Sequence, residues 1–114
     1  MKKIVAGFIL SAVAAAAFTS VSAQSKPFTV VETSIPEMQA AMKAGRVTSR
    51  QLVEQYLVRI ALYNSQINAV ITVNPKALEE ADRLDRERKA GKVRGPLHGI
   101  PVALKDNVLT NDIR

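Results

Sequence analysis

Cysteine and tryptophan are absent from this 114-residue chain, and histidine occurs once, as His98. Without cysteine the chain can form no disulfide and no thiolate metal site, and one histidine excludes a site built on several imidazoles. We therefore expect no metal site, and we expect no cofactor. Aromatic residues make up only 4% of the chain, so few side chains could stack on bases. The basic residues behind the net charge of +6 are interleaved with acidic ones, and we expect no nucleic-acid partner.

The N-terminal segment has the layout of a secretory signal peptide. Lys2 and Lys3 form a positive start, and residues 4–18 are apolar or small apart from one serine. This run is shorter than the roughly 20 residues that span a bilayer. We therefore expect residues 1–23 to be removed after Ala23 rather than kept as a membrane anchor. The mature product would be periplasmic or secreted, without a stable membrane anchor.

Two helices are predicted in the first half of the mature chain, after an exposed lead-in at residues 24–33. Ser34 and Glu37 have the spacing of a capping box, which predicts a helix from there to Gly45. A second capping box at residues 48–51 opens a longer helix with one apolar face: Leu52, Val53, Tyr56, Leu57, Ile60 and Tyr63. Since about three residues join the two helices, we expect them to pack as a hairpin.

A third helix is predicted from Pro75 to about Gly91, because proline is well placed at a first helical position. Acidic residues precede basic ones by four positions along it, as in Asp82–Arg86 and Asp85–Lys89, and this pattern indicates a solvated face.

Two apolar stretches stand out: residues 68–73 predict a short strand or an extended segment, and residues 100–104 predict a strand. The second is apolar on both sides, as in a sheet covered by helices, and it ends on Lys105. Sites in open α/β sheets gather beyond the carboxyl ends of strands, and burial converts a lysine into a general base near neutral pH. The spacing alone also suits an ordinary surface lysine.

Residues 48–108 resemble the N-terminal part of the amidase signature family. The resemblance rests on the Thr-Ser-capped helix, the Asn-Ala-Val segment, the Ala/acid/Arg-rich helix and the block GPLHGIPVALKDNV at residues 95–108. It implies an α/β fold with a mixed sheet covered by helices, of which this chain would hold about three helices and one or two strands. Residues 34–114 would then be the incomplete N-terminal part of an amidase domain.

The resemblance also implies an activity and a role for Lys105. Members of the family cleave the C–N bond of small carboxylic amides, or transfer the acyl group, with a Ser–Ser–Lys triad. Lys105 matches the lysine that acts as base. Asp106 and Asn107 match residues near the site, with a supporting role at most. We expect His98 to be structural, because the chain offers it no acidic partner at a readable spacing.

The serines depart from the family pattern. All precede Lys105 and none lies in a Gly/Ser-rich segment: Ser11, Ser20, Ser22, Ser25, Ser34, Ser49 and Ser65. We attribute Ser34 and Ser49 to helix capping. The chain thus carries the base without its nucleophile, leaves residues 100–104 without neighbouring strands, and is expected to be inactive alone, as an N-terminal fragment of an exported amidase. The alternatives are a truncated, non-catalytic helical interaction protein and the tRNA-dependent amidotransferase of the same family, which the export signal disfavours.

Overall fold

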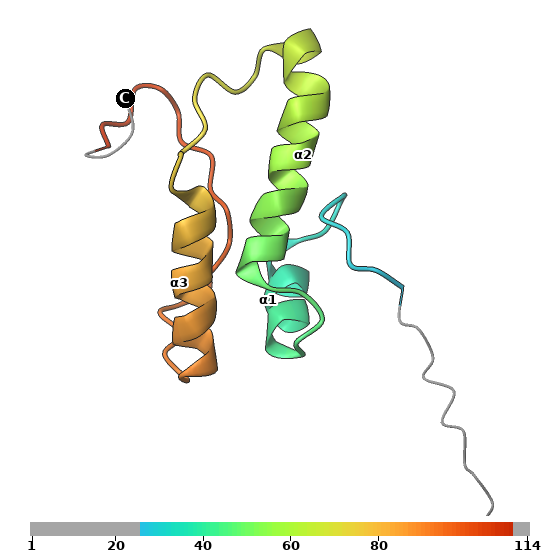
Figure 1. Ribbon diagram of the computed structural model, residues 1–114, viewed down its shortest axis with the longest axis vertical. Helices are drawn as coiled ribbons and strands as arrows, with labels where there is room; N and C mark the ends of the chain where they lie inside the picture. The colour runs from blue at the N-terminus through green and yellow to red at the C-terminus, as the bar shows by residue number, and fades with distance from the viewer. Residues whose placement is uncertain (1–25, 111–114) are drawn as a thin grey trace, which may run out of the picture.

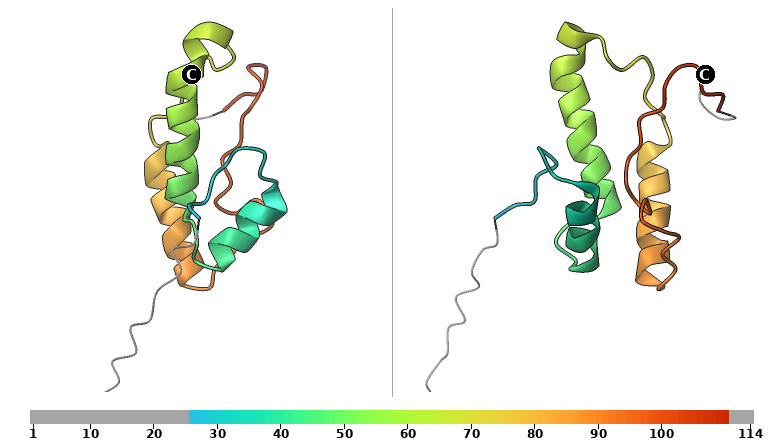
Figure 2. Two further views of the ribbon diagram at one scale, coloured as in Figure 1. Left: turned by 90° about the vertical axis from the view of Figure 1, so that its right-hand side faces the viewer. Right: turned by 180° about the vertical axis from the view of Figure 1, so that it is seen from behind.

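The computed structural model describes residues 26–110, and within that range the chain forms three α-helices and no β-strand. The helices are α1 (Ile35–Lys43), α2 (Ser49–Ile67) and α3 (Ala77–Lys89). Helices α2 and α3 lie side by side and run in opposite directions, and α1 lies near the start of α2 (Figure 1). Both α1 and the chain after α3 lie on one side of this pair (Figure 2, left).

The helix starts follow the predicted capping residues. At α2, the Gln51 backbone N–H donates to Thr48 Oγ1 at 3.1 Å, and the Thr48 N–H donates to Gln51 Oε1 at 2.9 Å. At α1, the Glu37 carboxylate accepts from the N–H and the hydroxyl of Ser34, at 2.8 and 2.6 Å. Both hydrogen bonds lower the pKa of the Glu37 carboxyl, and the bond from the Ser34 hydroxyl has the larger effect. Local sequence therefore determines where both helices begin.

Helix α3 begins two residues later than Pro75 predicts. The Asn74 side chain accepts from the Lys76 N–H at 2.8 Å, and its backbone carbonyl accepts from the Ala77 N–H at 3.1 Å. This turn delays the first helical residue to Ala77. The helix ends at Lys89, before Gly91, close to the predicted end.

A small core forms where α1, the start of α2 and the preceding segment meet. Its buried members are Val30, Met38, Ala41, Met42, Val47 and Leu52. Val30 belongs to the segment expected as an exposed lead-in, and that expectation is wrong for it, since Val30 is only 5% exposed. Gln55 on α2 holds this segment in place: its Oε1 accepts from the Val30 N–H at 3.0 Å, and its Nε2 donates to the Phe28 carbonyl at 3.1 Å.

Helix α2 packs extensively against α3. The short connection between α1 and α2 predicted instead that these two helices would pack as a hairpin. Val47 in that connection is buried in the core, so the chain turns and α1 meets only the beginning of α2. Two carboxylates on α3 face the same end of α2. Asp85 accepts from the backbone N–H groups of Ser49 and Arg50, at 2.8 and 3.1 Å, and Asp82 pairs with the Arg50 guanidinium at 2.6 Å. Asp82 and Asp85 therefore take part in the contact of α2 with α3, whereas their spacing from Arg86 and Lys89 predicted a solvated helix face.

Neither segment forms a strand within residues 26–110, because neither has a partner strand. The strand predicted at residues 100–104 is therefore not confirmed, and of the two forms predicted for residues 68–73 the strand is not seen. In the first segment, the Asn64 side chain takes both backbone groups of Val70: it accepts from the N–H at 2.8 Å and donates to the carbonyl at 2.9 Å. In the second, Val102 and Leu104 are 62% and 57% exposed. The expected burial of both faces is therefore wrong for this chain, whereas the expected lack of neighbours holds.

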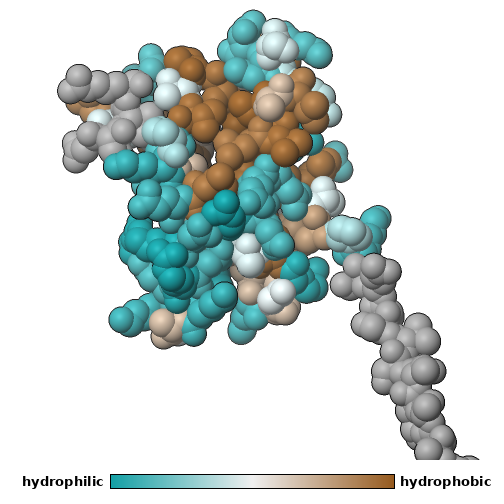
Figure 3. Space-filling model, viewed as in Figure 1, coloured by the Kyte–Doolittle hydropathy of each residue, from teal (hydrophilic) through white to brown (hydrophobic). Residues whose placement is uncertain are grey.

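An apolar surface results from these unpaired segments. Figure 3 shows it over the C-terminal half of α2 and the segments beside it. The exposed apolar side chains of these parts include Val58, Leu62, Ile71, Val73, Val102 and Leu104. No helix in the described part of the chain has the length and apolar content to cross a membrane. The predicted signal segment, residues 1–23, lies outside the described residues.

Candidate functional site

The loop between α3 and residue 100 is built around His98, which is 5% exposed. The His98 ring contacts the Leu84 carbonyl through Nε2 at 2.9 Å, and its Nδ1 faces the Arg94 backbone N–H at 3.3 Å. Since Nδ1 accepts from an N–H, the proton of the neutral ring lies on Nε2, which donates to the carbonyl. Nε2 thus holds the loop against α3 and Nδ1 ties two parts of the loop together, as a structural histidine would.

The carbonyl groups of this loop are held by side chains from two other elements. Gln39 on α1 donates through Nε2 to the carbonyls of Pro96 and His98, at 2.8 and 3.0 Å. Arg88 on α3 donates through Nη2 to the same His98 carbonyl at 2.9 Å, and to Gln39 Oε1 at 2.8 Å. The Arg88 bond fixes which end of the Gln39 amide is its oxygen, so the NH2 group faces the loop.

Ser49 supplies the corresponding contact from α2. Its hydroxyl donates to the Gly99 carbonyl at 2.8 Å, and the side chain is buried. The attribution of Ser49 to helix capping is therefore wrong, because Thr48 is the capping residue and Ser49 ties the loop to the helix. Gly99 has a φ of +78°, and a Cβ there would lie 3.1 Å from Ser49 Cβ and 3.4 Å from Met42 Sδ. Only glycine suits this conformation and this spacing.

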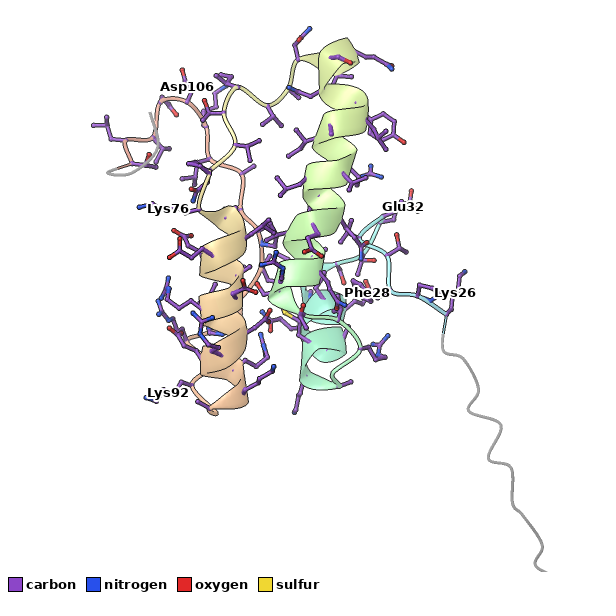
Figure 4. All side chains as sticks on the ribbon, in the orientation of Figure 1. Lys26, Phe28, Glu32, Lys76, Lys92 and Asp106 are labelled. Atoms are coloured by element: carbon purple, nitrogen blue, oxygen red, sulfur yellow. The ribbon has the colours of Figure 1, made fainter. Side chains whose placement is uncertain are left out.

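Lys105 lies beyond this anchored loop and is exposed. Its carbonyl accepts from the Val108 N–H at 2.9 Å, which closes a turn that contains Asp106 and Asn107, both exposed. Figure 4 shows Asp106 beyond the end of α3 at which the helix begins, nearer to Lys76 than to Lys92. The burial expected around the strand end is therefore not supplied by residues 26–110.

The serines of the described part are committed elsewhere or lie on the surface. Ser34 donates to Glu37, Ser49 donates to Gly99, and Ser65 lies exposed on α2. The anchored loop thus fixes where the segment that leads to Lys105 begins, but these serines supply no nucleophile beside Lys105.

Ion pairs connect the start of the loop to α3, and α3 to α2. Arg94 donates to Glu87 on α3 through Nε at 2.7 Å, and Glu87 also accepts from Arg83 at 3.2 Å. The hydrogen bonds from Arg94 lower the pKa of the Glu87 carboxyl, and the pKa of Arg94 is raised in turn. In the middle of α3, the charge of Asp82 raises the pKa of Arg50. These pairs join the loop to α3 and α3 to α2.

Sequence reasoning missed four residues of this arrangement: Gln39, Ser49, Asp85 and Arg88. In the contacts of Gln39 with the loop, of Ser49 with Gly99 and of Gln39 with Arg88, the two residues are 49 to 59 positions apart in the chain. Asp85 is 35 to 36 positions from its partners on α2. No local spacing reports contacts of such separation.

Other features of the surface carry no clear chemistry. A hollow lined by Phe28, Val30, Arg46 and Gln55, among others, lies between the segment before α1 and α2, away from the loop. Across residues 26–110, no group of three or more His, Cys, Asp or Glu side chains is placed to hold a metal ion.

Comparison with known proteins places the loop and Lys105 inside a matched region. The family model described as Amidase matches residues 51–114. A putative amidase from Arthroderma benhamiae is 45% identical over 75 residues, which cover 66% of this chain and 13% of that protein. A glutamyl-tRNA(Gln) amidotransferase subunit from Synechococcus sp. is 42% identical over 74 residues, covering 64% of this chain and 15% of that one.

A solved structure matches the helices as well as the sequence. The X-ray structure of the native peptide amidase from Stenotrophomonas maltophilia aligns with a TM-score of 0.69 at 48% identity, covering 70% of this chain and 17% of that chain. This chain thus spans between 13% and 17% of the length of these three relatives.

Proposed function

This chain belongs to the amidase family, and we propose that it provides the N-terminal helices and the general base, Lys105, of an enzyme that hydrolyses small carboxylic amides. The observation that carries the proposal is the block at residues 95–108, which lies within the matched region. It contains the loop that is anchored to all three helices, and after an apolar segment it ends in Lys-Asp-Asn-Val.

The chemistry follows that of a nucleophile activated by a neighbouring base. The neutral Lys105 amine would take a proton from a bridging serine, which in turn would take the proton of the nucleophilic serine as that oxygen attacks the amide carbonyl. Neither serine has a counterpart in this sequence. We therefore expect the 114-residue chain to bind no oxyanion and to hydrolyse no amide by itself.

The apolar surface supports a larger domain around these helices. Val102 and Leu104 lie directly before Lys105 in the chain and are more than half exposed, and Leu62 on α2 is 59% exposed. Apolar patches of this kind mark surfaces that meet other protein. In a complete amidase domain, strands beside residues 100–104 would bury this surface and lower the polarity around Lys105, as a base requires.

We further propose that the protein is exported. The positive start and the short apolar run at residues 1–23 support this location. Expression with a C-terminal tag, followed by N-terminal sequencing of the periplasmic or secreted fraction, should give a product that begins at Gln24. A product retained in the cytosol with Met1 intact would contradict export and would favour the amidotransferase alternative, because charging of tRNA occurs in the cytosol.

A chimera tests the enzymatic proposal directly. The segment of the Stenotrophomonas maltophilia peptide amidase that aligns with this chain is replaced by the corresponding residues of this chain, through Lys105. The chimera should hydrolyse a peptide amide, and Lys105→Ala should remove nearly all turnover without loss of the folded state. Lys92→Ala is the matched control, since Lys92 is an exposed lysine at the start of the same loop.

Two outcomes would contradict the proposal. The first is a folded chimera without turnover, which would favour the interaction-protein alternative. The second is a Lys105→Ala chimera as active as the Lys92→Ala control, which would show that another group is the base.

A further inference from the structure

The loop before Lys105 receives one side-chain donor from each helix. Gln39 on α1, Ser49 on α2 and Arg88 on α3 donate to loop carbonyls at 2.8 to 3.0 Å. We propose that these three are positioning residues for Lys105, because they determine the direction in which residues 100–105 leave the loop. The inference rests on the proposed role of Lys105 as base and adds the groups that hold the base in register.

The geometry goes beyond satisfying buried carbonyls. A buried carbonyl needs one donor from any source, whereas here the His98 carbonyl receives two, from different helices. Three attachment points on three separate elements fix both the position and the orientation of a short loop. Gly99 permits this close approach of the loop to α2, because a Cβ on it would be 3.1 Å from Ser49 Cβ.

The position of Lys105 is sensitive to this orientation. Lys105 follows Gly99 by six residues, and an extended chain advances about 3.3 Å per residue, so the lever is about 20 Å long. A rotation of about 5° at Gly99 would then move the Lys105 backbone by about 1.7 Å, and a displacement of about 1 Å can cost about 100-fold in rate. Strands beside residues 100–104 would reduce the displacement, so we expect a loss of about 10- to 100-fold in kcat.

The first test measures position in the full 114-residue chain. Because the chain has no cysteine, Lys105→Cys and Glu79→Cys allow two spin labels, whose distance distribution reports where residue 105 lies relative to α3. Gln39→Glu removes the donor to both carbonyls and keeps the oxygen that pairs with Arg88. It should broaden the 105–79 distribution. The label pair Ala61→Cys with Glu79→Cys, which joins α2 to α3, should be unchanged.

Matched substitutions separate the loop contacts from general effects. Gln66→Glu and Ser65→Ala make the same chemical changes as Gln39→Glu and Ser49→Ala, at exposed positions of α2. Both should leave the 105–79 distribution as it is. Ser49→Ala acts on a buried side chain and could unfold the chain, so Gln39→Glu, at a half-buried position, is the second variant that keeps the test decisive.

The second test measures catalysis in the peptide amidase chimera. Gln39→Glu and Ser49→Ala should lower kcat by about 10- to 100-fold with KM within about twofold, because a displaced base impairs the chemical step and not substrate binding. Gln66→Glu and Ser65→Ala should keep the kcat of the chimera.

Each result decides a different statement. If Lys105→Ala abolishes turnover while Gln39→Glu leaves both kcat and the 105–79 distribution unchanged, the positioning role is wrong and the proposed function stands. If Lys105→Ala keeps turnover, the proposed function itself is wrong. If both Gln39→Glu and Ser49→Ala lose the helical circular dichroism signal, these residues maintain the fold and the positioning role is overturned.

Discussion

Leu52 offers the sharpest test of the core, because its large side chain is fully buried, at 0% exposure. It packs where α1, the start of α2 and the segment before α1 meet. Leu52→Ala removes buried methyl groups and leaves a cavity, and substitutions of this kind cost about 2–5 kcal/mol. A small domain at the low end of stability has about 5 kcal/mol in total. We therefore expect Leu52→Ala to remove most of the free energy of unfolding.

The assay is urea unfolding of the full chain, followed by far-ultraviolet circular dichroism. Leu62→Ala is the matched control: it makes the same change on the same helix, at a position that is 59% exposed. Alanine and leucine have similar helix propensities, so the control should change the free energy of unfolding by no more than about 0.5 kcal/mol. Equal effects of the two substitutions would refute the core described above.

Three further predictions concern α3 and the glycines. Asp85→Ala should cost about 1–2 kcal/mol in urea unfolding, since α2 loses its carboxylate cap, and Asp85→Asn should cost less because its amide oxygen still accepts. In Gly91→Ala the new Cβ meets open space, so the substitution should cost about 1–2 kcal/mol of the free energy of unfolding for its positive φ alone. In Gly99→Ala the new Cβ also meets Ser49, so the cost should be clearly larger in the same assay. Equal costs would contradict the close contact at Gly99. Arg94 lowers the pKa of Glu87 below its ordinary 4.5, so their pair stabilises the fold above that pH, and the stabilisation is lost as the pH falls through the lowered value. Arg94→Gln should therefore raise the Glu87 pKa in an NMR titration and weaken the dependence of stability on acid pH. An unchanged titration of Glu87 would rule out the pair in solution.

The helices could be predicted because their signals are local. The capping box at Thr48 and Gln51 and the three-to-four spacing that begins at Leu52 predict α2, and the structure forms a helix from Ser49 to Ile67. The proline signal at Pro75 predicts α3 two residues early, since the turn that Asn74 forms overrides it. In both cases the interactions that decide the boundary lie within four residues.

The strands could not be predicted in the same way, because a strand exists only with a neighbour. The apolar content of residues 68–73 and 100–104 is that of buried strands, but a ladder of hydrogen bonds needs a second chain segment at the right distance. At Val70 the Asn64 side chain takes the place of that neighbour. Around Val102 the described part of the chain offers none, and the side chain is exposed.

The sequence by itself determined the three helices, the family and the position of Lys105 at the end of an apolar segment, since these depend on local periodicity and on an unbroken motif. Only the tertiary structure decided that Asp85 caps another helix and that Gln39, Ser49 and Arg88 meet on one loop. These contacts join residues that are 10 to 59 apart in the chain, so no local pattern encodes them. The packing of α2 against α3, and of α1 at their end, brings them together.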